Sequence, residues 1–303
     1  MCGACASALA RSQSEVPYRY RAKATALLIP DLHLSARVPP RMTDVQTFFA
    51  RHFVAISVNS RFRDDEGPDR FFAASGLLIR IGDILGILTA GHVVEYLDEA
   101  LNHRDIISLG CQLLDTFGET KLSDLGVPYD LKNSPRLHFH NDEQGLDFGV
   151  LFLHEHQARL IEKHNIVPLT YEASRNEPAD LDVFFLLGLP SELTSERVSP
   201  SGNATVALTM LRLKKAEAEE QSTLFPRFIA TIDSQTSLES LKGMSGGPIF
   251  GLNTERSNKY WIVAIQSSWR KSERKIFGCP VTHIYDILNE LYERAASELV
   301  EER

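Results

Sequence analysis

The stretch that decides the fold is GMSGGP at residues 243–248, between a polar segment at 234–242 and an apolar run that begins at Ile249. Because glycine and proline are common in turns of all kinds, this stretch is compatible with an ordinary turn between two strands. Its glycines also fit a tight turn that leaves backbone N–H groups free to point at one spot. A serine hydroxyl is a weak nucleophile at neutral pH and needs a base to take its proton. The partners of Ser245 therefore decide between a plain turn and a catalytic one.

Two upstream residues have the chemistry that such a serine needs. His92 follows an apolar segment at 84–88, and Asp147 opens another apolar run. A base, a carboxylate that orients the base and a nucleophile, in the order His92, Asp147 and Ser245, match the general template of serine hydrolysis. Each residue alone is more commonly structural, so the prediction depends on the three occurring together. Asp142 lies five positions before Asp147 and is the alternative for the carboxylate.

Three motifs resemble, in order and separation, those of the trypsin-like (chymotrypsin-fold) serine peptidases. TAGH at 89–92 is similar to the family's TAAH, DFGVL at 147–151 to its DIALL, and the GMSGGP stretch to its GDSGGP. ASGLLI at 74–79 resembles the strand before the family's histidine, and LGLP at 187–190 resembles a turn of its bacterial members. The resemblance is to bacterial-type members without disulfides, and it covers roughly residues 51–284.

The resemblance implies an all-β fold: two six-stranded antiparallel β-barrels (chymotrypsin-like) with a C-terminal α-helix, and an active site in the cleft between the barrels. Many short strand-like runs and few helical ones agree with an all-β architecture. We expect an N-terminal extension at residues 1–42, a first barrel with the histidine and aspartate at 43–160, and a second barrel with the serine, plus the helix, at 161–303.

Periodicity and composition predict the individual elements. Helices are expected at 43–51, 92–101, 156–165 and 284–299, the last from apolar residues at helical spacing. Strands are expected at 53–58, 71–81, 84–88, 106–114, 147–154, 183–187, 204–213, 227–232, 249–252, 260–267 and 275–281. Surface loops are expected at 115–133 and at the charged segment 214–220.

The same resemblance assigns a role to each residue of the site. Ser245 would attack the scissile carbonyl, His92 would take its proton and pass it to the leaving amine, and Asp147 would fix the imidazole tautomer. The N–H groups of Gly243 and Ser245 would bind the developing oxyanion. Digestive members of the family have an aspartate before the serine, and it pairs with an N-terminus freed by cleavage. Met244 stands there instead, so we expect no activation by N-terminal cleavage.

Three residues are candidates for substrate binding. Glu239 lies six positions before Ser245, where digestive trypsins have an acidic pocket residue. It would favour lysine or arginine in the substrate if the loop has no insertion, and it is a solvated charge if the loop is reshaped. Lys242, on the expected rim, would instead attract acidic substrates. By resemblance, Ser267 lies on the strand that lines the cleft, where the family has a serine that supports the catalytic carboxylate.

Charge and hydropathy exclude several classes of function. The net charge of −8 argues against nucleic-acid binding as the main function. The sequence has no run of about 18 apolar residues, so no transmembrane helix is expected. Its first residues lack the basic and apolar regions of a secretory signal. We therefore expect a cytoplasmic protein that acts on a protein or peptide substrate, with no nucleic-acid or membrane partner and with its oligomeric state left open.

Cysteines and histidines give weak signals. The cysteines are too few and too scattered for a disulfide framework: Cys2, Cys5, Cys111 and Cys279. The first two form a CxxC, which alone is a poor redox or metal motif. Two His-x-His pairs would each share one face of a strand: His138 with His140, and His154 with His156. These pairs are compatible with metal ligands or with solvated edge residues. Without an acidic or cysteine ligand at fixed spacing, we expect neither a metal nor a cofactor.

Two other functions remain open at this point. One is a peptidase-fold module that binds partners and turns over nothing, although an intact His, Asp and Ser set favours catalysis. The other is an esterase or another acyl hydrolase that uses the same three residues.

Overall fold

The computed structural model describes most of the chain. The described residues are 42–115, 117, 126–171, 174, 181–199, 203–216, 223–233, 236, 238–253 and 260–301. The expected extension at 1–42 lies outside them except for its last residue, and so do Cys2, Cys5 and positions 217–220 of the charged segment. None of the described helices is long and apolar enough to cross a membrane.

The expected helices are present within a few residues of their expected bounds, whereas the 3-10 helices η2 and η3 are not among the expected elements. The helices are α2 (Met42–Phe49), η1 (Ala50–His52), α3 (Gly91–Asn102), α4 (Glu155–Lys163), η2 (Ser191–Leu193), η3 (Lys271–Glu273) and α6 (Val281–Glu301), of which the η elements are 3-10 helices. The strands are β1 (Ala55–Phe62), β2 (Arg70–Ala74), β3 (Leu77–Ile81), β4 (Ile84–Thr89), β5 (Ile106–Leu114), β6 (Val127–Tyr129), β7 (Arg136–Asn141), β8 (Leu146–Phe152), β9 (Leu169–Thr170), β10 (Val183–Gly188), β11 (Thr209–Lys215), β12 (Phe228–Ile232), β13 (Pro248–Leu252), β14 (Tyr260–Arg270) and β15 (Lys275–Pro280). Three of them, β6, β7 and β9, are not among the expected strands.

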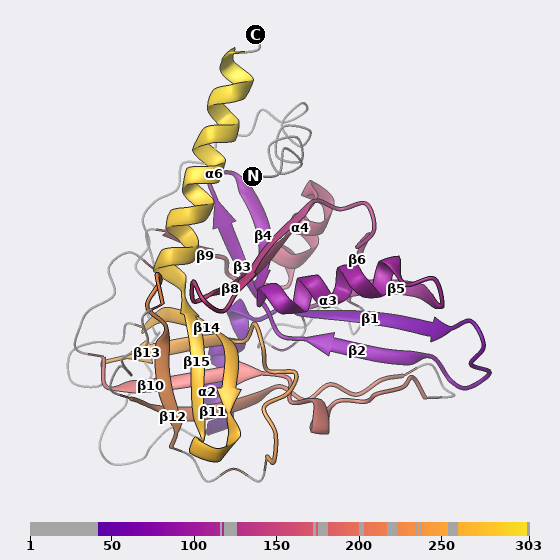
Figure 1. Cartoon of the computed structure of the whole chain (residues 1–303), viewed down its shortest axis with the longest axis horizontal. Coiled ribbons are helices and arrows are strands. Elements are labelled where there is room, and N and C mark those ends of the chain that lie inside the picture. The colour runs from indigo at the N-terminus through magenta and orange to yellow at the C-terminus, as the bar shows by residue number, and fades with distance from the viewer. Residues whose placement is uncertain are drawn as a thin grey trace.

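The second half of the chain forms a closed six-stranded antiparallel barrel. Its strand order is β10-β11-β12-β15-β14-β13, and the barrel appears in salmon, orange and yellow at the lower left of Figure 1. Apolar side chains from its strands form one buried cluster, which includes Phe184, Leu211 and Ile249. Closure leaves no free sheet edge, so every barrel strand is paired on both sides. This half has the barrel that the resemblance implies.

The first half forms two sheets, and a second closed barrel is not present among the described strands. The sheets have the orders β2-β1-β5-β6 and β7-β8-β4-β3-β9. The segment 71–81, expected as one strand, breaks at Ser75 and Gly76, because β2 pairs with β1 whereas β3 pairs with β4. The chain therefore changes sheets at this point, as strands do at the corners of packed sheets. An isolated bridge between Phe53 and Leu77 joins the two sheets at the corner.

One hydrophobic cluster runs through both halves. It contains Leu88 and Phe148 from the first half, Phe250 and Ile265 from the barrel, and Tyr285 from α6. All five side chains are completely buried. The two halves therefore share a core, and this core holds β4 and β8 against β13 and β14.

A buried histidine adds a polar link inside this core. His52, which is 0% exposed, lies in η1 between the two halves. Its Nδ1 donates to the carbonyl oxygen of Val167 at 2.6 Å, and its Nε2 accepts from the hydroxyl of Tyr260 at 2.6 Å. Burial lowers the pKa of His52 from 6.5 to about 4, so the ring is neutral at physiological pH.

The long helix α6 packs against both halves. It contacts β14 and β15 of the barrel and β3 of the first half, and Figure 1 shows it in yellow, running past them. Tyr285, which is 0% exposed, donates from its hydroxyl to the carbonyl oxygen of Leu169 at 2.5 Å. Further along, the Tyr292 hydroxyl donates to Asp83 at 3.0 Å.

Two cysteines lie in the described residues, one in each half. Cys111 is on β5 and Cys279 is on β15, and both thiols are free and buried. Burial raises the pKa of Cys111 to about 12 and that of Cys279 to about 11. Neither thiol is therefore ionised near neutral pH.

Candidate active site

His92 and Asp147 meet at the start of helix α3. The Nδ1 atom of His92 lies 2.8 Å from Oδ2 of Asp147, and the backbone N–H of His92 donates to Oδ1 at 3.0 Å. Because an ionised carboxylate can only accept, Nδ1 carries the ring proton in this contact. The lone pair of the neutral ring is then on Nε2. The Asp147 side chain is 10% exposed and that of His92 is 34% exposed, so the ring is more open to solvent than the carboxylate.

The local fold explains this geometry. The first N–H groups of a helix have no acceptor within the helix, and an acidic side chain near them is stabilised by the helix dipole. Asp147, on β8, supplies that carboxylate to α3. A Cβ at Gly91 would lie 2.1 Å from the carbonyl oxygen of Phe139, so only glycine lets α3 begin this close to β7. This contact explains the glycine in TAGH, where the resembling family has alanine.

Asp142, the alternative carboxylate, lies elsewhere. It occupies the turn between β7 and β8, and its side chain is 79% exposed. Its Oδ1 accepts from Arg227 at 3.0 Å. The structure thus brings Asp147, and not Asp142, to His92.

The turn that carries Ser245 is seated against the strand end that precedes His92. Gly246 has a φ of +82°, and a Cβ there would lie 2.1 Å from Oγ1 of Thr89 and 2.8 Å from the backbone nitrogen of Ala90. Ser245 is half-buried. Among the hydrogen bonds of the described residues, none joins the Ser245 hydroxyl to the His92 ring. Such bonds are commonly long without substrate and shorten only in the bound complex.

Two backbone N–H groups near Ser245 are held in fixed directions. The carbonyl of Lys242 accepts from the Ser191 N–H at 2.7 Å, and the carbonyl of Met244 accepts from the Gly247 N–H at 2.9 Å. In a trans peptide the C=O and N–H point in opposite directions, so these bonds orient the N–H groups of Gly243 and Ser245. Within the described part of the chain, neither N–H has an acceptor of its own. They are available to bind an anion.

Ser75 ties this turn to the first half, a role that the sequence alone does not reveal. Its hydroxyl donates to the carbonyl oxygen of Gly243 at 3.0 Å and accepts from the N–H of Leu189 at 2.9 Å. Its own carbonyl accepts from the Thr89 hydroxyl at 2.7 Å. Ser75 is completely buried. Three segments that are distant in sequence are therefore fixed around one residue, two by its hydroxyl and one by its carbonyl.

The three substrate-binding candidates lie at different places. The Glu239 side chain is exposed, and its backbone N–H donates to the carboxylate of Glu192 at 3.1 Å. This placement fits the solvated alternative. Lys242 is also exposed, at the edge of the Ser245 turn. The Ser267 hydroxyl donates to the carbonyl oxygen of Phe277 at 3.1 Å. This hydrogen bond lies within the barrel and is not made to the carboxylate of Asp147.

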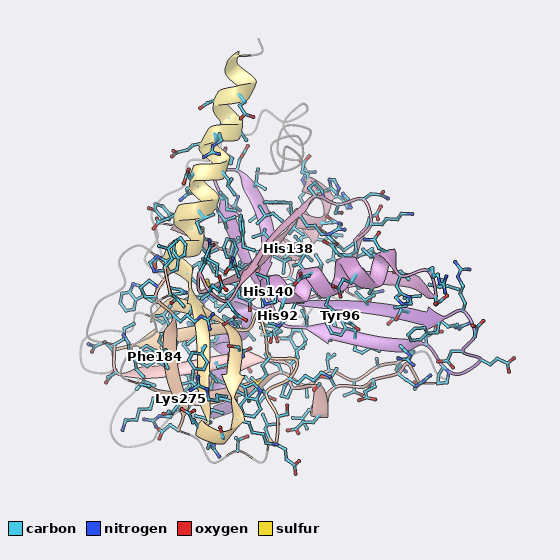
Figure 2. The ribbon with its side chains drawn as sticks, in the orientation of Figure 1. His92, Tyr96, His138, His140, Phe184 and Lys275 are labelled. Atoms are coloured by element: carbon cyan, nitrogen blue, oxygen red, sulfur yellow. The ribbon has the colours of Figure 1, made fainter. Side chains whose placement is uncertain are left out.

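His140 and Glu95 are neighbours of the site that the sequence analysis did not assign to it. His140, on β7, is directly opposite Asp147 in the β7–β8 register, and its ring centroid lies 5.7 Å from that of His92. Its Nδ1 lies 2.7 Å from Oε2 of Glu95 on α3. This hydrogen bond raises the pKa of His140 and lowers that of Glu95. Figure 2 shows His92 and His140 close together where the first half meets the barrel.

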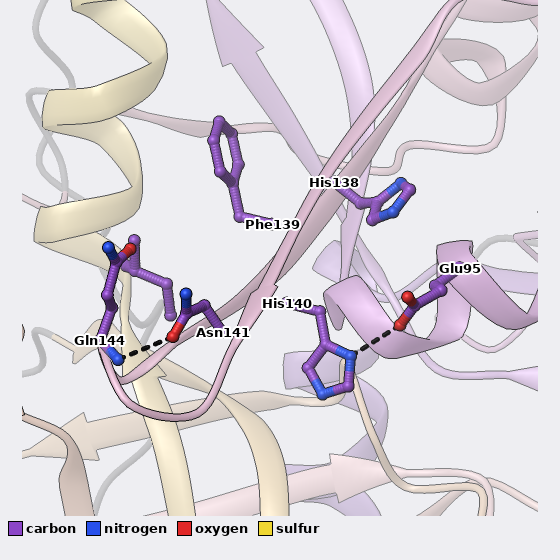
Figure 3. Close-up of a pocket in the computed structure, with 7 residues that line it drawn as sticks. Glu95, His138, Phe139, His140, Asn141 and Gln144 are labelled. Atoms are coloured by element: carbon purple, nitrogen blue, oxygen red, sulfur yellow. Dashed lines mark hydrogen bonds and ion pairs between the residues drawn. The ribbon is translucent and has the colours of Figure 1, made fainter. Parts of the chain in front are cut away.

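A pocket of about 340 Å³ opens beside this pair. Its lining includes Glu95, His138, His140, Asn141 and Gln144 (Figure 3). The sequence did contain a signal for it: RLHFHN at 136–141 alternates apolar and polar residues with the period of a strand. That pattern places both histidines on one face, but it does not say which strand lies opposite.

The comparisons with known proteins leave the family open. No protein-family model matches the chain, and no curated protein matches its sequence. Among solved structures, the chain is similar to a thermostable serine protease, AL20, from an extremophilic microorganism. The sequence identity is 10%, the TM-score is 0.43, and the similarity covers 81% of this chain and 98% of the other. A likeness this distant carries no argument about activity, so the function has to be argued from the geometry of the site.

Proposed function

We propose that this protein is a trypsin-like serine endopeptidase, which hydrolyses peptide bonds through Ser245, His92 and Asp147 and an acyl-enzyme intermediate. The observation that carries the proposal is the double contact of Asp147 with His92, next to a serine turn that rests on the same strand end. This contact places the ring lone pair on Nε2, the nitrogen that a catalytic base needs free.

In the proposed reaction, Ser245 Oγ attacks the carbonyl carbon of the substrate while His92 Nε2 takes the hydroxyl proton. The imidazolium that forms is stabilised by Asp147, and it returns the proton to the nitrogen of the leaving amine as the C–N bond breaks. Water then repeats the sequence on the acyl-enzyme, and the acid product leaves. The acyl-enzyme needs no group beyond these three side chains and water.

The N–H groups of Gly243 and Ser245 would stabilise the oxyanion of each tetrahedral intermediate. A donor of this kind contributes about 3 kcal/mol of transition-state stabilisation. Their directions are set by the bonded carbonyls of Lys242 and Met244, so little reorganisation is needed during the reaction. The Met244 side chain is completely buried in the barrel cluster. This packing supports an oxyanion turn that forms without a freed N-terminus.

A fluorophosphonate probe, which reacts with activated serines, tests the proposal. We expect the wild type to be labelled and both Ser245→Ala and His92→Ala to be unlabelled. Removal of a triad member lowers kcat by up to a million-fold. Ser297→Ala is the matched control, because Ser297 is an exposed serine on α6 that bonds only within its helix. An unlabelled wild type, or labelling that survives in Ser245→Ala, would refute the assignment.

Substrate trials separate the endopeptidase from the two alternatives. An esterase with the same residues would hydrolyse ester substrates and leave peptide substrates intact. A binding module would turn over neither and would still retain a partner. We expect hydrolysis of both peptide and ester substrates, with loss of both in Ser245→Ala.

A further inference from the structure

Side chains from β7, β8 and α3 converge at the proposed site in a way that triad chemistry does not require. His92, His140 and Asp147 each offer one possible ligand atom, and these atoms all lie within 4.8 Å of one another. His140 takes no part in the proposed hydrolysis. Its position is nevertheless well fixed, since β7 pairs with β8 along six residue pairs and His140 faces Asp147 across them.

Glu95 leaves one nitrogen of His140 available as a ligand. The Nδ1 atom is engaged by the Glu95 carboxylate at 2.7 Å, so the free lone pair is on Nε2. Figure 3 shows this second nitrogen facing away from Glu95. A histidine that donates one N–H to a carboxylate and ligates through its other nitrogen is the usual arrangement at protein metal sites.

We propose that His92, His140 and Asp147 form a binding site for a divalent transition-metal ion, for which Zn²⁺ is the natural probe. Two imidazoles and one carboxylate are ligands that Zn²⁺ takes readily, and three protein ligands leave one position for water. At zinc–ligand distances near 2.0–2.1 Å, tetrahedral ligand atoms are about 3.4 Å apart. Atoms that start up to 4.8 Å apart therefore need to approach by up to about 1.4 Å (4.8 − 3.4), which rotation of the side chains can supply.

The ion can reach this site from solvent. The side chains of His92 and His140 are 34% and 35% exposed. The pocket of about 340 Å³ lies directly beside His140 and has a mostly polar lining. His138, on the same face of β7, lies 3.9 Å from Asp98 and is the nearest further imidazole along the strand.

Bound metal would act as a reversible inhibitor, a consequence that rests on the proposed function. A neutral imidazole has one lone pair and one proton. If the ion binds Nε2 of His92, the lone pair that accepts the serine proton is taken. If the ion binds Nδ1, the proton moves to Nε2, which again cannot accept. Either way the ring stops being a base, and removal of the ion by a chelator restores it.

Calorimetric titration with Zn²⁺ tests the site without reference to activity. At a pH of about 8, which favours the neutral imidazoles that a metal ion needs, we expect one ion per chain in the wild type. His140→Ala should weaken the affinity by at least 100-fold. Glu95→Ala, which removes the partner of His140 from an exposed helix position, should weaken it by about 10- to 100-fold. His156→Ala is the matched control from the other His-x-His pair, where the rings of His154 and His156 stack at 6.0 Å; it should bind like the wild type.

Hydrolysis measured with and without Zn²⁺, each variant relative to its own metal-free rate, tests the inhibition. We expect Zn²⁺ to inhibit the wild type, a chelator to reverse this, and His140→Ala to resist it. Wild-type affinity in His140→Ala, or loss of binding in His156→Ala, would overturn the metal site. Zinc binding that depends on His140 in a chain without hydrolase activity would support the site and refute the proposed function instead. Full activity with no zinc binding would do the reverse.

Discussion

Asp147 combines two tasks in one side chain, since it accepts from the ring and from the backbone of the same histidine. Asp147→Asn should keep the backbone contact and present an amide N–H to the ring, which moves the ring proton to Nε2. We expect kcat to fall by about 10⁴-fold with little change in KM, as in the general triad template. Steady-state kinetics on a peptide substrate measures this.

Asp142→Asn is the matched control, because it makes the same chemical change on an exposed residue five positions away. Its activity should stay within a few-fold of the wild type. Equal losses in both variants would mean that Asp147 has no special role.

The sequence predicts His92, Asp147 and Ser245 as site residues because each interrupts or borders an apolar run, where a polar residue is conspicuous. The structure brings His92 and Asp147 into contact, and the catalytic role of the three stays a prediction. Ser75 and His140 could not be placed in this way. The hydroxyl of Ser75 bonds to backbone groups of Leu189 and Gly243. Because nearly every residue has such groups, the sequence does not indicate which ones Ser75 contacts. His140 reaches the site only through the register of two strands.

At the scale of elements, η1 is held to the segment before β9 and to β14 by the neutral ring of His52. Its pKa is lowered from 6.5 to about 4, so above pH 6.5 neither the folded nor the unfolded chain is protonated there and the ring contributes fully to stability. As pH falls from 6.5 to 4, the unfolded chain binds a proton that the folded chain does not. The free energy of unfolding should drop by about 3 kcal/mol over this window.

Urea denaturation across this pH range, in the wild type and in His52→Gln, isolates the contribution. Glutamine is neutral throughout and can still donate and accept. We expect His52→Gln to be less stable than the wild type at pH 7 and to lose less stability on acidification. Parallel pH profiles for the two proteins would contradict the assignment of this transition to His52.

Hydrophobic periodicity and composition predict where helices and strands lie. They do not say which strands pair with each other. The helices and most strands are within a few residues of their expected bounds. The second closed barrel, which the resemblance implies, is not present among the described strands. The segment 71–81, expected as one strand, turns a corner at Ser75 and Gly76, so that β2 and β3 pair with different partners in two sheets. Similarly, β6 is a three-residue strand inside an expected loop, too short to produce a periodic signal.

For the whole molecule, the shared cluster and α6 predict one cooperative unfolding transition. Tyr285 is completely buried between the halves, so Tyr285→Ala should cost about 3–5 kcal/mol by leaving a cavity. The fluorescence of Trp261 and Trp269, both on β14, reports on the barrel, whereas far-UV circular dichroism reports on all elements. We expect the two probes to agree on the midpoint within each protein, and the midpoint of the variant to be lower than that of the wild type.

The matched control is Tyr96→Ala, because Tyr96 is 53% exposed and should matter little to stability. Separate midpoints for the two probes would mean that the halves unfold independently and that the shared core does not couple them.

The two buried thiols offer a kinetic test of whether the two halves of the chain open together. Cys111 and Cys279 sit in different halves, shielded and un-ionised while the chain is folded. An alkylating reagent can reach either sulfur only when the surrounding half opens, and peptide mass mapping tells the two apart. Each thiol therefore reports how often its own half opens. If the two halves open only together, both thiols should be alkylated at the same rate.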